Sequence, residues 1–464
     1  MPPAGAPGCV PAVPAPTSGV FQGGPRDQYG RQVADDAVPR PQGTAARSRG
    51  RLGRVVALSL LAGLVAAAFL VFAPFIPATE AGITGALLCG LAIGWALLTV
   101  LSVRFTDQPQ RWAAAPALFM GVGGLLLLTA GSAVLEPLAW VWPPVLLALV
   151  IWMFLRVRRD ARSGGGRALL YPVLVVLALA SVGGGYQTVQ GAVDSSRAMP
   201  GQLIDVGDHR LHLSCAGSGS PTVVLDPGAG MVSAQLDLVA PVVAEQTQVC
   251  IYDRAGRGWS EPAMTRQDAT QIAADLHTLL EAGEVPGPYV LAGHSFGGLY
   301  ALTFAARYPD DVAGMVLIDT TPPASTQAST GEPAGDEGAA IGDRLATLVS
   351  ISARLGVTRL IDQPTPDSVR STLHEYGQGG ASAQEAAALH DFADKPLVVL
   401  TAGIGQDPQD AAAHQVLAGL STNGVHRVVE GADHGGMVTD STGAAATSRA
   451  ILDVVASLRS GQSL

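Results

Sequence analysis

The sequence predicts a chain of two parts, a helical membrane region followed by an α/β domain with a mostly parallel sheet. Long apolar runs fill much of the chain up to residue 193. From residue 200 onward, short strand-type segments alternate with helix-type segments, which is the pattern of a sheet covered by helices. Around Ser295, a strand, a glycine turn and a helix follow one another directly.

The composition supports a membrane region and argues against nucleic acid as a partner. Of the 464 residues, 48% are hydrophobic and only 14% are charged, whereas soluble domains carry about 25% charged residues. The mean hydropathy is +0.32. The net charge of −10 disfavours nucleic-acid binding. The four cysteines lack the spacing of a metal site.

The first 193 residues divide into a tail and a membrane region. Residues 1–50 are rich in Pro, Gly, Ala and Arg, which predicts a disordered tail. Residues 51–193 contain five apolar runs, and a membrane-spanning helix needs about 20 such residues. The runs cover 55–76, 83–103, 113–135, 138–157 and 168–189.

The arginines predict the orientation of this region. They precede the first run and also lie between runs two and three and between runs four and five, whereas the other two loops carry no Lys or Arg. Because cytoplasmic loops are enriched in Lys and Arg, the N-terminus should be cytoplasmic. We therefore expect an integral plasma-membrane protein whose α/β domain, residues 200–464, is extracytoplasmic.

The α/β domain begins with a predicted hairpin and continues with alternating strands and helices. Residues 320–394 interrupt the alternation with a Pro- and Gly-rich stretch and two helical stretches, 341–355 and 383–392. The predicted strands are 202–206, 210–215, 222–226, 248–253, 289–292, 314–319, 396–401 and 425–430, and the other predicted helices are 231–244, 267–282, 296–307, 411–420 and 444–458.

The segment Gly293-His294-Ser295-Phe296-Gly297 has the pattern of a nucleophile elbow. A Cβ atom at either glycine would clash with the neighbouring strand or helix. The turn leaves the serine oxygen at the carboxyl edge of the sheet, and the following helix points its positive end at it. A bare motif of this kind also arises by chance in a chain with 56 glycines, so the rest of the site must support it.

Acyl-transfer chemistry needs a nucleophile, a base and an acid that orients the base. Ser295 is the candidate nucleophile. His434, on a glycine-rich loop after a short strand, is the candidate base. For the acid the sequence favours Asp407, which follows a strand between the serine and the histidine. Asp319, at the end of the strand after the elbow helix, is the alternative, and Asp410 is a third candidate.

An oxyanion that forms on the substrate needs fixed hydrogen-bond donors. We expect one to be the backbone N–H of Phe296, directly after the serine. The other should be the N–H of Ala229, in the glycine turn 226–230 that follows a predicted strand.

Together these segments resemble the α/β-hydrolase family. The resemblance covers residues 201–460 and implies an eight-stranded, mostly parallel sheet with residues 320–394 as a lid. It also implies a hydrolase that needs no metal or cofactor. The segments that carry it are Leu-Asp-Pro-Gly-Ala-Gly (225–230), Tyr-Asp-Arg-Ala-Gly-Arg-Gly-Trp-Ser (252–260), Gly-His-Ser-Phe-Gly-Gly (293–298) and Gly-Ala-Asp-His (431–434).

The resemblance also implies roles for residues outside the catalytic constellation. In similar proteins the positions of Asp253, Arg254, Arg257 and Ser260 form a loop that braces the site. The family's strand order places the strands of Cys215 and Cys250 side by side, which favours a disulfide in an extracytoplasmic domain. The sequence departs from the family in two places, since the oxyanion turn lacks the usual His-Gly and the loop before Asp407 is one residue longer.

These features predict a membrane-anchored serine hydrolase. Members with Asp at the elbow open epoxides or carbon–halogen bonds, and Ser295 instead indicates acyl transfer from an ester, thioester or amide, including a peptide. The expected partners are such a small-molecule substrate and the lipid bilayer. The alternative is a non-catalytic membrane binding or signalling protein whose hydrolase-like domain only recognises a ligand. The sequence indicates neither the substrate nor the oligomeric state.

Overall fold

The structure, a computed structural model, describes residues 44–162, 164–263, 265–323, 336–361, 365–405 and 407–464. Contacts divide the chain into two units, Met1–Ala45 and Ala46–Leu464. Most of the predicted tail, residues 1–43, lies outside the described residues. The two regions predicted after the tail, residues 51–193 and 200–464, lie in the second unit. In this unit a long helix ends at Ser195 and the first strand begins at Gln202.

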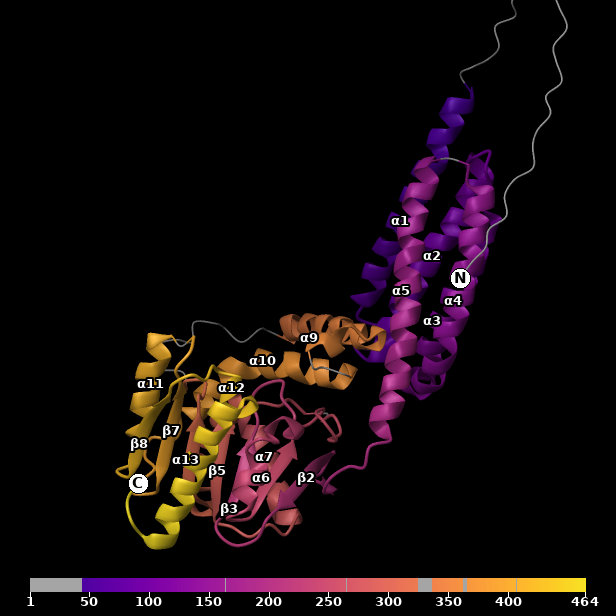
Figure 1. Cartoon of the computed structure of the whole chain (residues 1–464). Coiled ribbons are helices and arrows are strands. Elements are labelled where there is room, and N and C mark those ends of the chain that lie inside the picture. Colours follow the sequence, from indigo (N-terminus) through magenta and orange to yellow (C-terminus); the bar gives the residue numbers. More distant parts are fainter. Residues whose placement is uncertain (1–43, 163, 264, 324–335, 362–364, 406) are drawn as a thin grey trace, which may run out of the picture. The chain divides into compact units, whose positions relative to one another are not determined.

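The N-terminal part of this unit is a set of long apolar helices (Figure 1). Among the described residues, four helical segments are long and apolar enough to cross a membrane. The third, Arg111–Asp160, has 50 residues. A 3₁₀ turn, Gly131–Val134, divides it into α3 and α4, so the prediction of five crossings stands as a prediction. The helices are α1 Thr44–Val71, α2 Glu80–Phe105, α3 Ala114–Ala130, α4 Leu135–Asp160 and α5 Gly164–Ser195, with a 3₁₀ helix at Arg111–Ala113.

Small residues let these helices approach closely. A Cβ atom on Gly63 would lie 2.9 Å from the Cα atom of Gly94, which packs α1 against α2. A Cβ atom on Gly124 would lie 2.8 Å from the carbonyl oxygen of Gly85, which packs α2 against α3. Between α4 and α5, the Ser181 hydroxyl donates a hydrogen bond to the Pro143 carbonyl over 2.6 Å. Close glycine contacts and hydroxyl-to-backbone bonds are typical of helix packing in membranes.

The C-terminal part is built on an eight-stranded sheet with the order β1-β2-β4-β3-β5-β6-β7-β8. The pairs β1–β2 and β2–β4 are antiparallel, and all other neighbours are parallel, which confirms the predicted mostly parallel sheet. The strands are β1 Gln202–Asp205, β2 Arg210–Ala216, β3 Thr222–Asp226, β4 Val249–Asp253, β5 Tyr289–His294, β6 Val312–Ile318, β7 Leu397–Ala402 and β8 Gly424–Val429.

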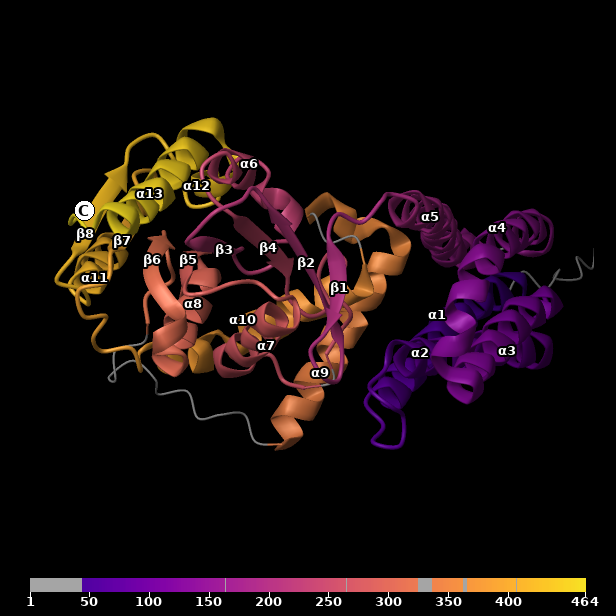
Figure 2. The same cartoon turned by 90° about the horizontal axis from the view of Figure 1, so that it is seen from below.

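Helices cover both faces of the sheet (Figure 2). One buried cluster joins a sheet face to α7, α8 and α11, and a second joins the other face to α6 and α13. The central strands β3 and β5 are buried along their whole length, because apolar cores lie on both of their faces. These helices are α6 Ala240–Ala244, α7 Ala269–Ala282, α8 Phe296–Arg307, α11 Pro408–Ala418, α12 Gly436–Thr439 and α13 Ser441–Ser460, with 3₁₀ helices at Ser233–Leu236 and Pro309–Asp311.

Two predicted helices differ from the structure. The segment 231–244 forms a 3₁₀ helix, Ser233–Leu236, and a short α6, because Pro241 fits only the first turn of a helix. The predicted helix 383–392 is wrong, since the helix there ends at Ala386 after beginning at Pro366. A capping box at Thr365 starts this helix, and the glycines at its centre concealed it in the sequence.

The predicted lid, 320–394, contains two longer helices in its described part. They are α9 Asp336–Ser350 and α10 Pro366–Ala386, separated by 3₁₀ helices at Ile351–Leu355 and Val357–Ile361. Cys215 of β2 lies opposite Cys250 of the neighbouring strand β4. A disulfide joins these two residues.

Candidate active site

Ser295 lies at the tip of a sharp turn between β5 and α8. Its backbone has φ 55° and ψ −120°, a strained conformation that a non-glycine residue adopts only when its surroundings hold it there. The Ser295 N–H donates to the carbonyl oxygen of Ile318 at the end of β6, over 3.0 Å. The serine therefore sits above the carboxyl ends of two central strands, at the N-terminus of α8.

Glycines on both sides of Ser295 make this turn possible. A Cβ atom on Gly293 would lie 2.3 Å from the carbonyl oxygen of Gly297. A Cβ atom on Gly297 would lie 2.3 Å from the carbonyl oxygen of Asp226 at the end of β3. Both distances are far below van der Waals contact, so the elbow packs only because neither position has a side chain.

The structure brings Ser295, His434 and Asp319 into one hydrogen-bonded row. The Nε2 atom of His434 lies 3.0 Å from the Ser295 hydroxyl oxygen. The Nδ1 atom of the same ring lies 2.6 Å from Oδ2 of Asp319. These contacts join residues 139 and 115 positions apart in the chain. The arrangement can pass a proton from the hydroxyl to an imidazole that a carboxylate orients.

The preference for Asp407 as the acid is corrected by this geometry. Asp407 is exposed and caps the N-terminus of α11, where its carboxylate accepts the backbone N–H of Gln409 over 2.8 Å. Asp410 lies in the first turn of the same helix. Capping satisfies the Asp407 side chain locally, and Asp319 takes the place beside His434.

Hydrogen bonds hold Asp319 in its ionised form. Burial acts to raise the pKa of the Asp319 carboxyl, but the bonds from His434 and from the backbone N–H of Ala402 outweigh it, and the pKa is lowered. The Ala402 N–H lies 2.9 Å from Oδ1. The backbone of Asp319 has φ 43°, which turns the carboxylate from the end of β6 toward His434.

His294 supports the loop that carries His434. Its Nε2 atom lies 2.8 Å from the carbonyl oxygen of His434, and the ring is almost fully buried. Burial, followed by the neighbouring His434 ring, lowers the pKa of His294 to about 4. The neutral ring donates its Nε2 proton to that carbonyl, and the contact with the Ser295 hydroxyl is made by His434.

The predicted oxyanion turn lies directly against the serine. A Cβ atom on Gly228 would lie 3.2 Å from the Cβ atom of Ser295. A Cβ atom on Gly297 would lie 2.8 Å from the carbonyl oxygen of Pro227. The turn that contains Ala229 and the start of α8 that contains Phe296 therefore flank Ser295 together.

A buried arginine fixes this turn. Arg254 donates to the carbonyl oxygens of Pro227 and Gly228 over 2.7 Å each. It also donates to the Asp226 carboxylate over 2.6 Å. Burial raises the pKa of Asp226 to about 6, although the arginine acts to lower it. The loop that the resemblance predicts to brace the site thus acts through Arg254 on the oxyanion turn.

A lid residue, Glu375, completes this charge cluster. Its carboxylate lies 2.8 Å from the Arg254 guanidinium, also pairs with Arg257, and accepts the backbone N–H of Gly230 over 3.0 Å. Burial acts to raise the pKa of Glu375, but Arg254 and Arg257 lower it by more. Helix α10 of the lid is therefore tied to the oxyanion turn by a buried ion pair.

Sequence reasoning missed Glu375. Nothing in its local pattern distinguishes it from a surface glutamate, and it lies 145 positions from Gly230. The only available signal was the pair Arg254 and Arg257, because buried arginines near a site require carboxylate partners.

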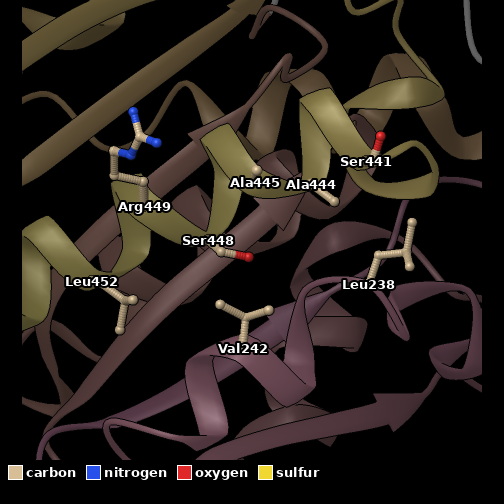
Figure 3. Close-up of a pocket in the computed structure, with 8 residues that line it drawn as sticks. All are labelled: Leu238, Val242, Ser441, Ala444, Ala445, Ser448, Arg449 and Leu452. Atoms are coloured by element: carbon tan, nitrogen blue, oxygen red, sulfur yellow. The ribbon is translucent and has the colours of Figure 1, made fainter.

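A groove on the C-terminal part lies away from Ser295, His434 and Asp319. It has a volume of about 450 Å³ and runs between α13 and the segment around α6 (Figure 3). None of the residues with candidate chemistry lines it, so it is not the candidate active site. Among the described residues, no group of three metal-ligating side chains occurs. The groove is lined by Leu238, Val242, Ser441, Ala444, Ala445, Ser448, Arg449 and Leu452.

Comparison with known proteins agrees with the fold. Residues 221–347 match the family model of the alpha/beta hydrolase fold. The chain is 36% identical over 163 residues to an uncharacterized protein of Schizosaccharomyces pombe, covering 28% of this chain and 30% of that protein. It is 37% identical over 112 residues to a pimeloyl-[acyl-carrier protein] methyl ester esterase of Chromobacterium violaceum, covering 24% and 41%.

A further relative is 2-(acetamidomethylene)succinate hydrolase of Mesorhizobium japonicum, 31% identical over 125 residues, with 27% of this chain and 44% of that protein covered. A solved structure, the enol-lactonase from Burkholderia xenovorans, matches with a TM-score of 0.41 and 18% identity, over 55% of this chain and 100% of that chain. The chain spans less than half the length of each of these curated relatives.

The fold, the elbow and the family match together define the class. The C-terminal part has the α/β-hydrolase fold, and apolar helices long enough to cross a membrane precede it.

Proposed function

We propose that the chain is a membrane-anchored serine hydrolase that cleaves ester, thioester or amide bonds through an acyl-enzyme. The observation that carries the proposal is the position of His434, with one ring nitrogen 3.0 Å from the Ser295 hydroxyl and the other 2.6 Å from the Asp319 carboxylate. The esterase among the relatives supports the ester as the first substrate class to test.

In the proposed mechanism the Ser295 oxygen attacks the substrate carbonyl carbon while Nε2 of His434 takes the hydroxyl proton. Asp319 remains ionised and stabilises the imidazolium. The N–H groups of Phe296 and Ala229 bind the oxyanion, and the positive end of α8 adds to this stabilisation. His434 then protonates the leaving alcohol, thiol or amine. Water repeats the sequence on the acyl-enzyme and releases the acid.

A fluorophosphonate probe tests the nucleophile directly. The full-length chain in detergent should be labelled at Ser295, and Ser295→Ala should abolish the labelling. Ser460→Ala, an exposed serine near the end of α13, is the matched control and should label as the wild type does. Labelling that persists in Ser295→Ala contradicts the proposal. A correctly folded chain that labels nowhere supports the non-catalytic alternative.

We also propose that the N-terminus is cytoplasmic and the hydrolase domain extracytoplasmic. The arginine distribution supports this orientation, and so does the disulfide between Cys215 and Cys250, because disulfides persist outside the reducing cytosol. Protease added to intact cells should remove the hydrolase domain and spare an epitope at the N-terminus. The reverse pattern contradicts the orientation.

A further inference from the structure

Helix α9 of the lid has an apolar stripe that the other described residues leave exposed. Ile341, Leu345 and Val349 follow one another at spacings of four residues, so they lie along one side of the helix. Their exposed fractions are 51%, 46% and 51%. Leu348 extends the same stripe at its edge.

The adjoining side of α9 packs on the ends of α1 and α2. Leu348 and Ile351 contact a buried apolar cluster that includes Val71, Ile76 and Ile83. Val71 is the last residue of α1 and Ile83 lies in the first turn of α2. The exposed stripe is therefore continuous with a surface where the lid meets two candidate membrane spans.

Arginines of the lid fasten this contact. Arg344 of α9 donates to the carbonyl oxygens of Val71 and Ile76, over 2.7 and 2.6 Å. Val71 is the last residue of α1, where helix carbonyls lack partners of their own, and Ile76 lies in the loop that follows. Arg354 forms two bonds to the Glu80 carboxylate at the start of α2, over 2.5 and 3.1 Å.

The loop that Arg344 binds carries exposed aromatic side chains. Phe72 and Phe75 are 43% and 70% exposed. They lie between two candidate membrane spans, α1 and α2, and exposed phenylalanines can insert into a lipid interface. The stripe of α9 and these phenylalanines thus flank the same end of α1.

The lid also reaches the candidate nucleophile. Helix α10 packs beside α9 (Figure 1), and its Tyr376 lies edge-on to Phe296 with ring centroids 5.5 Å apart. Phe296 directly follows Ser295. The predicted lid therefore contacts both the ends of two candidate spans and the residue that follows Ser295.

We propose that the apolar stripe of α9 lies in the lipid interface and that the enzyme takes its substrate, a long-chain acyl lipid, from the bilayer. The substrate part rests on the function proposed above. Ser295 forms an ester with the acyl chain, the lipid alcohol leaves with the proton from His434, and water then releases the fatty acid. Five apolar helices would thereby place the lid as well as anchor the chain.

Lipid contact can be measured without any activity. An environment-sensitive fluorophore is attached at Leu345→Cys in full-length protein that also carries Cys9→Ser and Cys89→Ala, in vesicles with and without doxyl-labelled phosphatidylcholine. We expect the doxyl lipid to quench this site strongly. The control site Val416→Cys, 73% exposed on α11, should not be quenched. Equal quenching at both sites overturns the proposal. A blue-shifted but unquenched fluorophore at residue 345 also overturns it, because a second copy of the chain then covers the stripe.

The substrate class is tested with two esters, p-nitrophenyl acetate in solution and p-nitrophenyl palmitate embedded in vesicles. Replacing Ile341, Leu345 and Val349 by Ser should lower turnover of the embedded ester about tenfold or more, because the lid loses its apolar contact with lipid. Turnover of the acetate should change less than about twofold, since the variant leaves Ser295, His434 and Asp319 unchanged.

The pair Val416→Ser and Val428→Ser, at exposed positions outside the lid, is the matched control and should change neither rate. An equal loss on both esters, or no loss on either, overturns the inference. Wild-type turnover of the acetate but not of the embedded ester overturns the choice of substrate alone. If neither ester turns over and the fluorophosphonate probe does not label Ser295, the proposed function fails, and quenching at residue 345 still decides whether the lid contacts lipid.

Discussion

The Nδ1 atom of His434 lies 2.6 Å from Oδ2 of Asp319, and the opposite ring nitrogen faces the Ser295 hydroxyl. One imidazole thus connects a loop after β8 with the ends of β5 and β6. Asp319 is held from its other side by the Ala402 N–H at the end of β7. The ring orientation is therefore fixed by three neighbouring strands of the sheet.

Replacing Asp319 should affect activity far more than replacing Asp407. In Asp319→Asn the imidazole loses both its orienting acceptor and the charge that stabilises the imidazolium, so kcat for p-nitrophenyl acetate should fall about 10³- to 10⁴-fold. Asp407→Asn keeps a side chain able to cap α11 and should change kcat less than about twofold. A larger loss in Asp407→Asn than in Asp319→Asn would return the acid to Asp407.

Gly228 should tolerate no side chain. In Gly228→Ala the new Cβ atom would lie 2.9 Å from Nδ1 of His294 and 3.2 Å from Cβ of Ser295. The oxyanion turn must shift to relieve this contact, so kcat should fall about 10- to 100-fold with a smaller change in KM. Gly435→Ala, beside His434, meets nothing within 4 Å and is the control. Equal kinetics of the two variants would show that the position of the turn does not matter.

Glu375 should stabilise the domain through its two arginines. Glu375→Ala leaves Arg254 and Arg257 buried with less compensating charge, and the free energy of unfolding should fall by about 3–5 kcal/mol. Glu385→Gln, which removes a charge from the same helix but keeps an acceptor for the Thr270 N–H, should lower it by less than about 1 kcal/mol. Urea unfolding followed by tryptophan fluorescence provides the comparison, and similar losses would contradict the special role of Glu375.

His294 should make stability fall in mild acid. Its pKa is about 4 in the folded chain against an ordinary value of 6.5, so the native state binds fewer protons than the unfolded state between these pH values. The contribution of the neutral His294 ring to the free energy of unfolding is therefore fully present above pH 6.5 and is lost as the pH falls toward 4. The loss from this one residue is about 3 kcal/mol.

The stability difference between wild type and His294→Gln isolates this contribution, since Asp226 and other groups titrate in both proteins. The difference should shrink by about 3 kcal/mol between pH 7 and pH 4. The same comparison with His390→Gln, an exposed histidine, is the control. A pH-independent difference for His294→Gln would contradict the buried neutral ring.

The fold and the elbow could be predicted because their signals are local. Apolar strands with intervening helices define the sheet, and Gly293 and Gly297 mark a turn whose backbone leaves no room for side chains. The mostly parallel eight-stranded sheet is confirmed.

The choice between two carboxylates could not be made in the same way. Asp319 and Asp407 both follow strands that end at the same edge of the sheet, and the sequence pattern alone does not separate them. The difference arises from three-dimensional detail, because Asp407 caps α11 whereas the positive φ of Asp319 turns its side chain to His434. Glu375 was hidden for a related reason, since its partners lie far away in the chain.

The most direct test of the central claim is mass spectrometry of the full-length protein quenched in acid soon after mixing with p-nitrophenyl acetate. We expect one added acetyl group, located by fragmentation on Ser295 and absent in Ser295→Ala. Turnover of the ester with no acetyl group on Ser295, or with the acetyl group on another residue, would contradict it.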